Sequence, residues 1–414
     1  MRRHNFKAHQ LLKPVDPPFH RANGRARLCN VKKTVFVLST DYWLNSLHGS
    51  SILSLFRALT KLGYRVKVLL PSIKKKNIEV ELFSVNSLDV RRHIPLVTLL
   101  SLYGRALKLV FEEKNPIVIF DPPMLPLFLL AMVFRKSKGI MLILSRPLIE
   151  RGFFGWLNLL NFRLWLILGK NFVEGFTAIS PFEAAEFSRL GKIPENKITV
   201  IPSPLGEKFE KFNFFGNRNE LRLKLGLRAS ARKKVLLYQG VLDKRRGILE
   251  FLELFHETFK GNYGIVLLLI GDGPAADSIK NFITNSGATN IFLLGPFPYS
   301  KMPEAIMACD VGLVLLPDKP LWRYQCPTKL VEFLALGKPV IASDLPGIRW
   351  IARKSSQVFY IKEMTSSGFK EALQKLLFRD ESITAESMQF RKEIIHKFSS
   401  FSVAQMLSQM ICSL

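Results

Sequence analysis

The feature that most constrains the fold is the alternation of short apolar runs with helical segments along the chain. KTVFVLST (33–40) is a continuous apolar run of strand length, and YRVKVLLPS (64–72) is a second. Between them, SSILSLFRALTKLG (50–63) has helical spacing and ends at a glycine. Apolar strands without strict alternation are typical of parallel sheets that helices cover on both faces. The other runs predicted as strands are 116–120, 139–144, 175–180, 197–203, 234–240, 264–273, 290–295 and 310–317.

This order predicts an α/β protein with two doubly wound Rossmann-like domains in tandem, which fits 414 residues. Residues 1–32 have no periodicity and indicate a flexible basic tail. The segment 204–219 has mixed composition and no clean period, so we place the domain boundary there. The predicted units are residues 33–205, residues 206–395, and an amphipathic C-terminal helix, 396–414, which is expected to complete the N-terminal domain.

The formal net charge of +27 indicates that any charged partner of the protein is an anion. The excess of Lys and Arg covers the whole chain and is densest in residues 1–33. Nucleic acid, an anionic membrane or phosphorylated substrates would each explain it, and so would a basic proteome without any partner. We find no basic helix with interleaved aromatic residues, so no specific nucleic-acid partner is expected. No pair among Cys29, Cys309, Cys326 and Cys412 has metal-ligand spacing, which predicts reduced thiols, no metal site and a cytoplasmic protein.

Two apolar segments raise the question of a membrane. MLPLFLLAMVF (124–134) is too short to span a bilayer, and FFGWLNLLNFRLWLILG (153–169) is interrupted by Asn158, Asn161 and Arg163. The second segment either lies in a membrane interface or packs as a core helix between the domains. Because basic residues flank these segments, we expect peripheral association with the inner face of an anionic membrane. The basic residues are Lys74–Lys76, Arg91, Arg92, Arg105, Lys108, Arg135, Lys136 and Lys138.

The stretch CPTKLVEFLALGKPVIASD (326–344) predicts a short helix followed by a buried strand. Pro327 suits the first helical turn and Thr328 can cap it, so the free N–H groups there favour an anion. Glu332 lies one turn deeper on the same face, where its carboxylate could accept hydrogen bonds from a ribose diol. The alternative is a surface ion pair between Lys329 and Glu332.

Two strand-to-helix loops carry further candidates, because ligands of parallel sheets bind at the carboxyl ends of strands. GVLDKRRG (240–247) places Lys244, Arg245 and Arg246 in succession, which suits a phosphate or a solvated loop. GDGP (271–274) is weaker evidence for a ligand site, because a tight turn that needs positive φ explains these glycines as well as a ligand does.

These motifs, in this order, resemble the nucleotide-sugar-binding half of group 1, or family 4, glycosyltransferases. The resemblance covers residues 234–350 closely and the N-terminal half loosely, through ISPFEAAEFSRLG and KITVIPSPLG. It implies a GT-B fold with two domains that face a central cleft. It also implies a nucleoside-diphosphate sugar donor, a lipid-linked or polysaccharide acceptor, and transfer with retention, without a metal or other cofactor.

The resemblance also implies residue roles. Arg246 matches a diphosphate-binding cation, Glu332 matches the second Glu of a Glu-x7-Glu pattern, and both are expected in catalysis. The implied donor-binding set is Gly240, Arg245, Arg246, Gly271, Gly273, Phe297, Thr328, Lys329 and Glu332. The implied acceptor-side set is His48, Gly49, Ser50 and Arg146.

The chain departs from the pattern in four places. Tyr324 replaces the first Glu of the pair, and Val241 replaces a frequent Arg. A single Gly49 stands where two glycines are common, and SRPLIE (145–150) replaces an acceptor-side His or Asp. A glycosyltransferase therefore leads, with three alternatives: a catalytically weak relative that acts as a binding subunit, a nucleic-acid-binding protein, and a GT-B epimerase, which the motifs fit less well.

Overall fold

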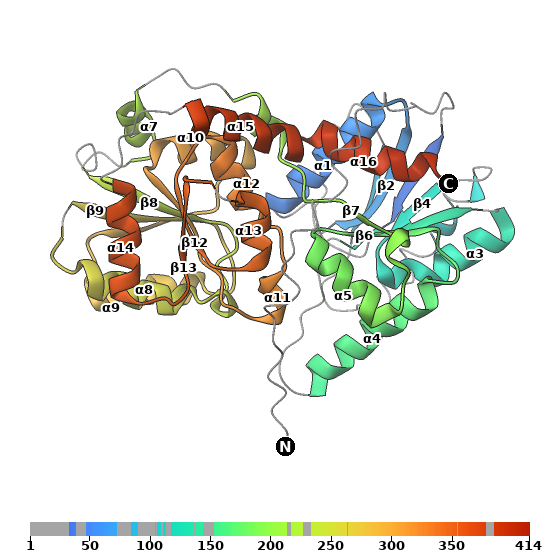
Figure 1. Ribbon diagram of the computed structural model, residues 1–414, viewed down its shortest axis with the longest axis horizontal. Helices are drawn as coiled ribbons and strands as arrows, with labels where there is room; N and C mark the ends of the chain where they lie inside the picture. Colours follow the sequence, from blue (N-terminus) through green and yellow to red (C-terminus); the bar gives the residue numbers. More distant parts are fainter. Residues whose placement is uncertain are drawn as a thin grey trace.

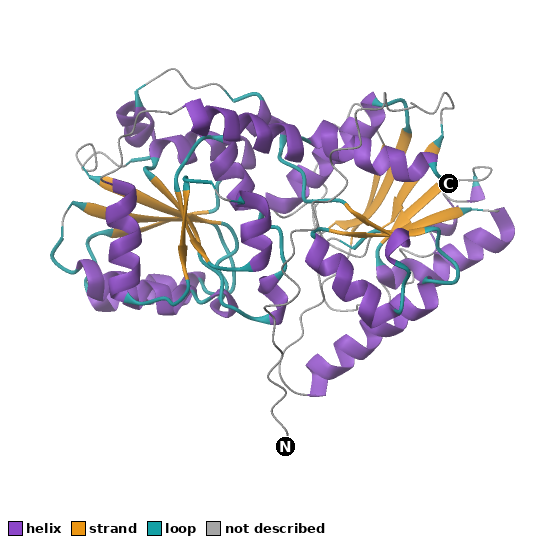
Figure 2. Cartoon of the chain, in the orientation of Figure 1, coloured by secondary structure: helices purple, strands orange, loops and turns teal. Residues whose placement is uncertain are grey.

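The protein is described from a computed structural model. The described residues are 33–38, 47–72, 84–89, 104, 106–108, 111–112, 117–135, 137–143, 153–212, 217–226, 233–262, 264–353, 355–377 and 385–414. Two parallel sheets form the two halves of the molecule, each enclosed by helices (Figures 1 and 2). The predicted pair of doubly wound α/β domains is therefore confirmed.

The N-terminal sheet has seven parallel strands in the order β3-β2-β1-β4-β5-β6-β7. Its apolar strand residues point alternately to the two faces, as the pleat requires. Val35 and Val37 pack under α1 and α16, whereas Phe36 and Leu38 pack against the layer that contains α3, α4 and α5. The strands are β1 (Thr34–Leu38), β2 (Arg65–Ser72), β3 (Ser84–Asp89), β4 (Ile117–Phe120), β5 (Lys138–Met141), β6 (Gly175–Ala178) and β7 (Ile198–Val200). The helices are α1 (Leu47–Lys61), α3 (Leu125–Arg135), α4 (Phe153–Gly169), α5 (Pro181–Gly191) and α16 (Ser400–Cys412).

The C-terminal sheet has six parallel strands in the order β10-β9-β8-β11-β12-β13. α10, α12, α13 and α15 cover one face, and α8, α9 and α14 cover the other. The strands are β8 (Lys234–Gln239), β9 (Ile265–Ile270), β10 (Ile291–Gly295), β11 (Val311–Val314), β12 (Val340–Ser343) and β13 (Val358–Ile361). The helices are α6 (Glu207–Glu210), α7 (Arg218–Lys224), α8 (Ile248–Phe259), α9 (Ala276–Ser286), α10 (Met302–Ala308), α11 (Pro320–Arg323), α12 (Thr328–Ala335), α13 (Pro346–Ala352), α14 (Ser366–Leu377) and α15 (Ala385–Phe398).

The chain crosses between the domains twice, and the two crossings lie side by side. After β7, the backbone N–H of Leu205 donates to the carbonyl of Phe398, and Leu205 forms a parallel bridge with Ser399. α16 then packs on α1 through Val403 and Leu407. The red C-terminal helix thus returns to the blue N-terminal elements in Figure 1. The boundaries at 205/206 and 395/396 stay a prediction.

Several expectations from the sequence need correction. The edge strands β3 and β13 were not predicted, because SVNSLD has no apolar pattern and VFYI is short. The C-terminal helix 396–414 is two helices, since the chain breaks at Ser399, which caps α16 by accepting from Ser402 N–H. The tail 1–32 lies outside the described residues.

The expectation about the cysteines holds only in part. Cys309 and Cys326 are free and buried, as predicted. Cys412 is disulfide-bonded, so the prediction of reduced thiols is wrong for it. Spacing along the chain identifies local metal motifs, whereas a disulfide depends on which residues folding brings together. Cys29 lies outside the described residues.

Candidate active site

The candidate donor-site residues gather because of the strand order of the C-terminal sheet. β8 and β11 are neighbours, and the chain winds away from them in opposite directions. The carboxyl ends of such a strand pair form the switch point where parallel sheets bind ligands. The loop with Arg246 follows β8, and α12 with Lys329 and Glu332 follows β11. Strand order therefore brings together residues that are more than eighty positions apart.

Glu332 lies inside the domain, with 6% of its surface exposed. Its Oε1 accepts from the Tyr299 hydroxyl at 2.9 Å, and its Oε2 accepts from the Gln239 side-chain amide at 2.9 Å. Burial raises its pKa to about 7, although both hydrogen bonds and the neighbouring Lys329 act in the opposite direction. The carboxyl group therefore changes its charge near neutral pH and is held on both oxygens.

Lys329 is equally buried, with 8% of its surface exposed. Its Nζ lies 4.0 Å from the centre of the Tyr238 ring and has no hydrogen-bond partner among the described residues. Burial lowers its pKa well below the usual value, and nearby Arg246 lowers it further. The alternative of a surface pair between Lys329 and Glu332 is wrong, because neither side chain is at the surface.

Arg246 ends the short 3-10 turn Lys244–Arg246 after β8. Its guanidinium lies 4.8 Å from the centre of the Trp322 ring, and its buried Nε has no partner among the described residues. Arg246 and Lys329 also act on one another electrostatically. Two neighbouring basic side chains with unused N–H groups form a site suited to an anion such as a phosphate.

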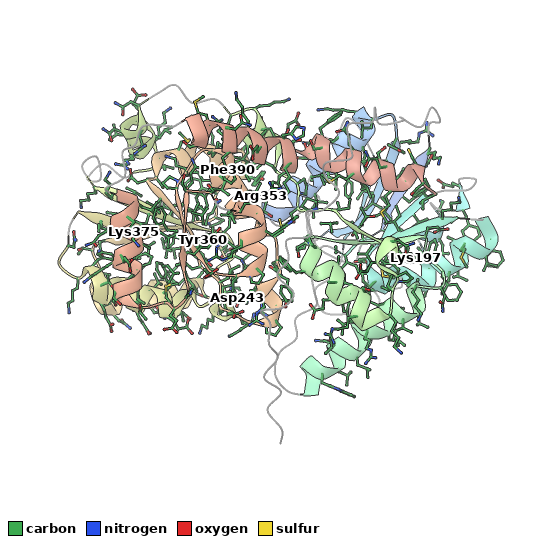
Figure 3. The ribbon with its side chains drawn as sticks, viewed as in Figure 1. Lys197, Asp243, Arg353, Tyr360, Lys375 and Phe390 are labelled. Carbon is green, nitrogen blue, oxygen red and sulfur yellow. The ribbon has the colours of Figure 1, made fainter. Side chains whose placement is uncertain are left out.

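Arg245 is arranged differently. Its guanidinium binds both carboxylate oxygens of Asp243, with Nε at 3.0 and 2.9 Å. Figure 3 shows Asp243 at the lower edge of the C-terminal domain, on the side of α11 in Figure 1. This ion pair holds the pKa of Asp243 below its usual value, chiefly through the hydrogen bond from Arg245. The Arg245 guanidinium is therefore already occupied by Asp243.

The predicted glycines serve loop packing. Gly271 has φ of 150°, and a Cβ on it would lie 1.8 Å from the Gly240 carbonyl oxygen. Gly273 has φ of 154°, and a Cβ on it would lie 2.4 Å from the Leu242 carbonyl oxygen. The loops after β8 and β9 therefore touch through their backbones, which supports the interpretation as a tight turn. Gly240 itself has φ of 117° and open space where a Cβ would be.

Thr328 and Phe297 complete the set of donor-site candidates. Thr328 is the first residue of α12, and Pro327 occupies the cap position without a side-chain hydrogen bond, so the expected cap by Thr328 is wrong. Phe297 is half-buried and packs against the core cluster that contains Leu330 and Phe333 of α12.

The acceptor-side candidates are less well defined. His48, Gly49 and Ser50 lie in the first turns of α1, which begins at Leu47. The residues implied for the acceptor side therefore begin a helix. Arg146 and the rest of 145–150 lie outside the described residues.

Tyr324, the residue at the first Glu position, contacts the other domain. Its ring stacks on Phe182 of α5 at 5.7 Å, and its carbonyl accepts from the Ser180 hydroxyl at 2.6 Å. The position that would hold a carboxylate thus joins the two domains.

Sequence reasoning missed four residues that shape the site: Gln239, Tyr238, Tyr299 and Trp322. A polar residue at the end of an apolar run, as in KVLLYQG, is the one signal that could have found Gln239. The described residues contain no group of three or more His, Cys, Asp or Glu that could hold a metal ion.

Comparisons with known proteins agree with this geometry. The family model "Glycosyl transferases group 1" matches residues 222–393. The chain is 24% identical over 372 residues to the capsular polysaccharide biosynthesis glycosyltransferase CapM of Staphylococcus aureus, covering 82% of this chain and 90% of CapM. It is 29% identical over 173 residues to TuaC of Bacillus subtilis, named for teichuronic acid biosynthesis, covering 41% of this chain and only 39% of TuaC.

The fold has a close counterpart among solved structures. HepE of Anabaena, in complex with UDP, superposes with a TM-score of 0.70 at 15% sequence identity, over 92% of this chain and 100% of HepE. WaaG, a glycosyltransferase involved in lipopolysaccharide biosynthesis, superposes with a TM-score of 0.67. The chain therefore has a GT-B fold, and its residues 222–393 are similar to the glycosyl transferases of group 1.

Proposed function

We propose that the protein transfers a sugar from a nucleoside-diphosphate sugar to a lipid-linked or polysaccharide acceptor, with retention of anomeric configuration. The observation that carries this proposal is the meeting of two basic side chains, the half-buried Arg246 and the buried Lys329, with the Glu332 carboxylate, which follows Lys329 by one turn of α12. The cations suit the diphosphate, and the carboxylate suits the ribose hydroxyls.

The chemistry requires that charge on the leaving diphosphate be neutralised. Arg246 has the geometry for this role, because its fork can bind two phosphate oxygens and Trp322 holds its guanidinium plane. Lys329 would contribute a second, point-like charge. Two protein cations can supply the neutralisation, so the proposed reaction uses no metal or other cofactor.

Relatives support the choice of substrates. The HepE structures carry UDP or UDP-glucose, and CapM and TuaC are named for the biosynthesis of polymers. Retention follows the resemblance to family 4 and is tested separately.

The first experiment is a thermal-shift screen of UDP-, GDP- and ADP-sugars. A donor at about 100 times its dissociation constant stabilises the protein by about 2.7 kcal/mol. The donor found is then supplied with candidate acceptors, and the anomeric proton of the product is examined by nuclear magnetic resonance. Chelation of divalent metal should leave turnover unchanged.

We also propose that α4 rests on an anionic membrane at the cytoplasmic face. α4 packs on α5 through Phe162 and Leu166, so the alternative of a core helix between the domains is wrong. Its outer side exposes a stripe at helical spacing: Leu157, Leu160, Leu164 and Leu168, each 40–49% exposed, beside Trp156 at 56%. No described helix is both long and apolar enough to cross a bilayer.

Two exposed basic residues of the N-terminal domain suit the same surface. Arg163 and Lys138 are exposed, and each basic residue near an anionic membrane contributes about 1 kcal/mol. Lys74–Lys76, Arg91, Arg92, Arg105 and Lys136 lie outside the described residues. Vesicle co-sedimentation tests the proposal: binding should need anionic lipid and weaken as salt rises. Equal recovery in the supernatant with and without such vesicles at low salt would contradict it.

A second candidate function is a binding subunit with weak turnover. The contact of Tyr324 with Phe182 favours it, because the family's first Glu is absent and its position faces the other domain. Nucleotide binding without measurable transfer to any acceptor would select this alternative.

A further inference from the structure

Tyr299 stands between the candidate donor site and the linker that joins the domains. It follows β10, and its hydroxyl donates to Oε1 of Glu332 at 2.9 Å. Its ring also meets the linker, where Phe209 of α6 packs at 5.3 Å between ring centres. Tyr299 thus contacts both the Glu332 carboxylate and the segment where the chain crosses between the domains.

The linker fits Tyr299 closely at Gly206. A Cβ on Gly206 would lie 2.5 Å from the Tyr299 hydroxyl oxygen and 2.6 Å from Cε1. Gly206 has φ of −70° and ψ of 141°, which any residue adopts. The glycine is therefore needed for the contact with Tyr299 and not for its backbone conformation.

The same stretch is fixed to the returning crossing. Leu205 N–H donates to the Phe398 carbonyl, and Glu210 of α6 accepts from the backbone N–H and hydroxyl of Ser400 at 2.6 and 2.9 Å. A change in the angle between the domains must be absorbed at these crossings, and it would move Gly206 against Tyr299.

We infer that Tyr299 is a positioning residue, which ties the Glu332 carboxylate to the interdomain linker and so makes nucleotide affinity depend on the domain arrangement. The part of this inference that concerns nucleotide rests on the proposed function. The link between Tyr299, Glu332 and Gly206 rests on the contacts alone.

Electrostatics gives this link a measurable signature. The groups that act on Glu332 are Tyr299, Gln239 from β8 and Lys329 from α12. Arg246 acts on Lys329, and Glu210 from α6 acts on Tyr299. Of the influences that lower the pKa of Glu332, the hydrogen bond from Tyr299 is the largest. Its loss should raise that pKa further above about 7.

The experiment is an infrared titration of the ligand-free protein, which follows the protonated carboxyl band that Glu332→Gln removes. A hydrogen bond to a charged group is worth about 1.5 kcal/mol, or about one pKa unit. Tyr299→Phe keeps the ring and should raise the midpoint by about that amount. Gly206→Ala should also raise it, because the added Cβ displaces the hydroxyl from Glu332. Tyr360→Phe, which removes a hydroxyl bonded to the Arg353 carbonyl, is the matched control and should not move it.

Each outcome is decisive. An unmoved midpoint in Tyr299→Phe overturns the inference, and so does a shift in Tyr299→Phe without one in Gly206→Ala, since the linker would then have no influence. UDP affinity, measured by calorimetry in the same variants, should fall about tenfold for Tyr299→Phe. If the wild type binds no UDP-, GDP- or ADP-sugar while the midpoints shift as expected, the proposed function fails and the structural link stands.

Discussion

Replacement of Lys329 by methionine should stabilise the protein and at the same time weaken its affinity for nucleotide. Lys329 is buried, and its amine has no hydrogen-bond partner among the described residues. Methionine keeps an unbranched apolar chain of similar length in the same space. The substitution therefore removes a buried amine that lacks a hydrogen-bond partner among the described residues, without leaving a large cavity.

The magnitude follows from two opposing contributions. A buried donor without a partner costs about 1–3 kcal/mol. The contact of the Lys329 amine with the Tyr238 ring, at 4.0 Å, returns about 0.5–2 kcal/mol. The net gain in the free energy of unfolding should be about 1 kcal/mol, which corresponds to about 2–4 °C in Tm for a domain of this size. Loss of a charge-assisted bond to diphosphate should weaken UDP binding by about 10- to 150-fold.

The assay measures Tm by calorimetry with and without UDP, for the wild type and for Lys329→Met. The control is Lys375→Met on the outer helix α14 (Figure 3), where the lysine is exposed and forms an ion pair with Glu371. The control should change stability by less than about 0.5 kcal/mol and leave UDP affinity unchanged.

Two results would refute the reasoning. A Tm that falls in Lys329→Met means that the amine is satisfied in the folded protein. An unchanged UDP affinity means that Lys329 does not contact the diphosphate. We expect Lys329→Met to have a higher Tm than the wild type and a smaller rise in Tm when UDP is added. A lysine with a structural role only would not change the effect of UDP.

Three further predictions concern other positions. The pKa of Glu332 in the folded protein is about 7 against an ordinary 4.5, so the folded protein binds this proton more tightly than the unfolded chain and loses stability as pH rises from 4.5 to 7. In Glu332→Gln, the free energy of unfolding, measured with urea at several pH values, should fall less over this range; an unchanged pH dependence would contradict the assignment. Arg246→Ala should lower kcat/KM by about 10- to 150-fold, whereas Lys244→Ala, at an exposed position, should have a much smaller effect; equal kinetics in both variants would argue against Arg246. Leu160→Ser with Leu164→Ser should reduce co-sedimentation with anionic vesicles without changing Tm, and full retention on vesicles would move the membrane contact elsewhere.

The fold class could be predicted from the sequence, and so could a candidate position for the donor site. Its apolar runs report local burial on both faces of a strand, which leads to parallel sheets and to functional loops at their carboxyl ends. Arg246 and Glu332 could be chosen on that basis, because strands β8 and β11 carry them to the same edge.

Tertiary structure alone decided the partners of these residues. Arg246 packs on the Trp322 ring, Glu332 accepts from the Tyr299 hydroxyl, and Arg245 binds the Asp243 carboxylate. None of these pairs could be identified from the sequence. The same applies to Tyr324, whose sequence position suggested a donor contact and whose ring packs on the other domain. Periodicity records how deeply each residue is buried along its own element. It does not record which distant side chain fills the space opposite, because that is set by how the helices and the two domains pack.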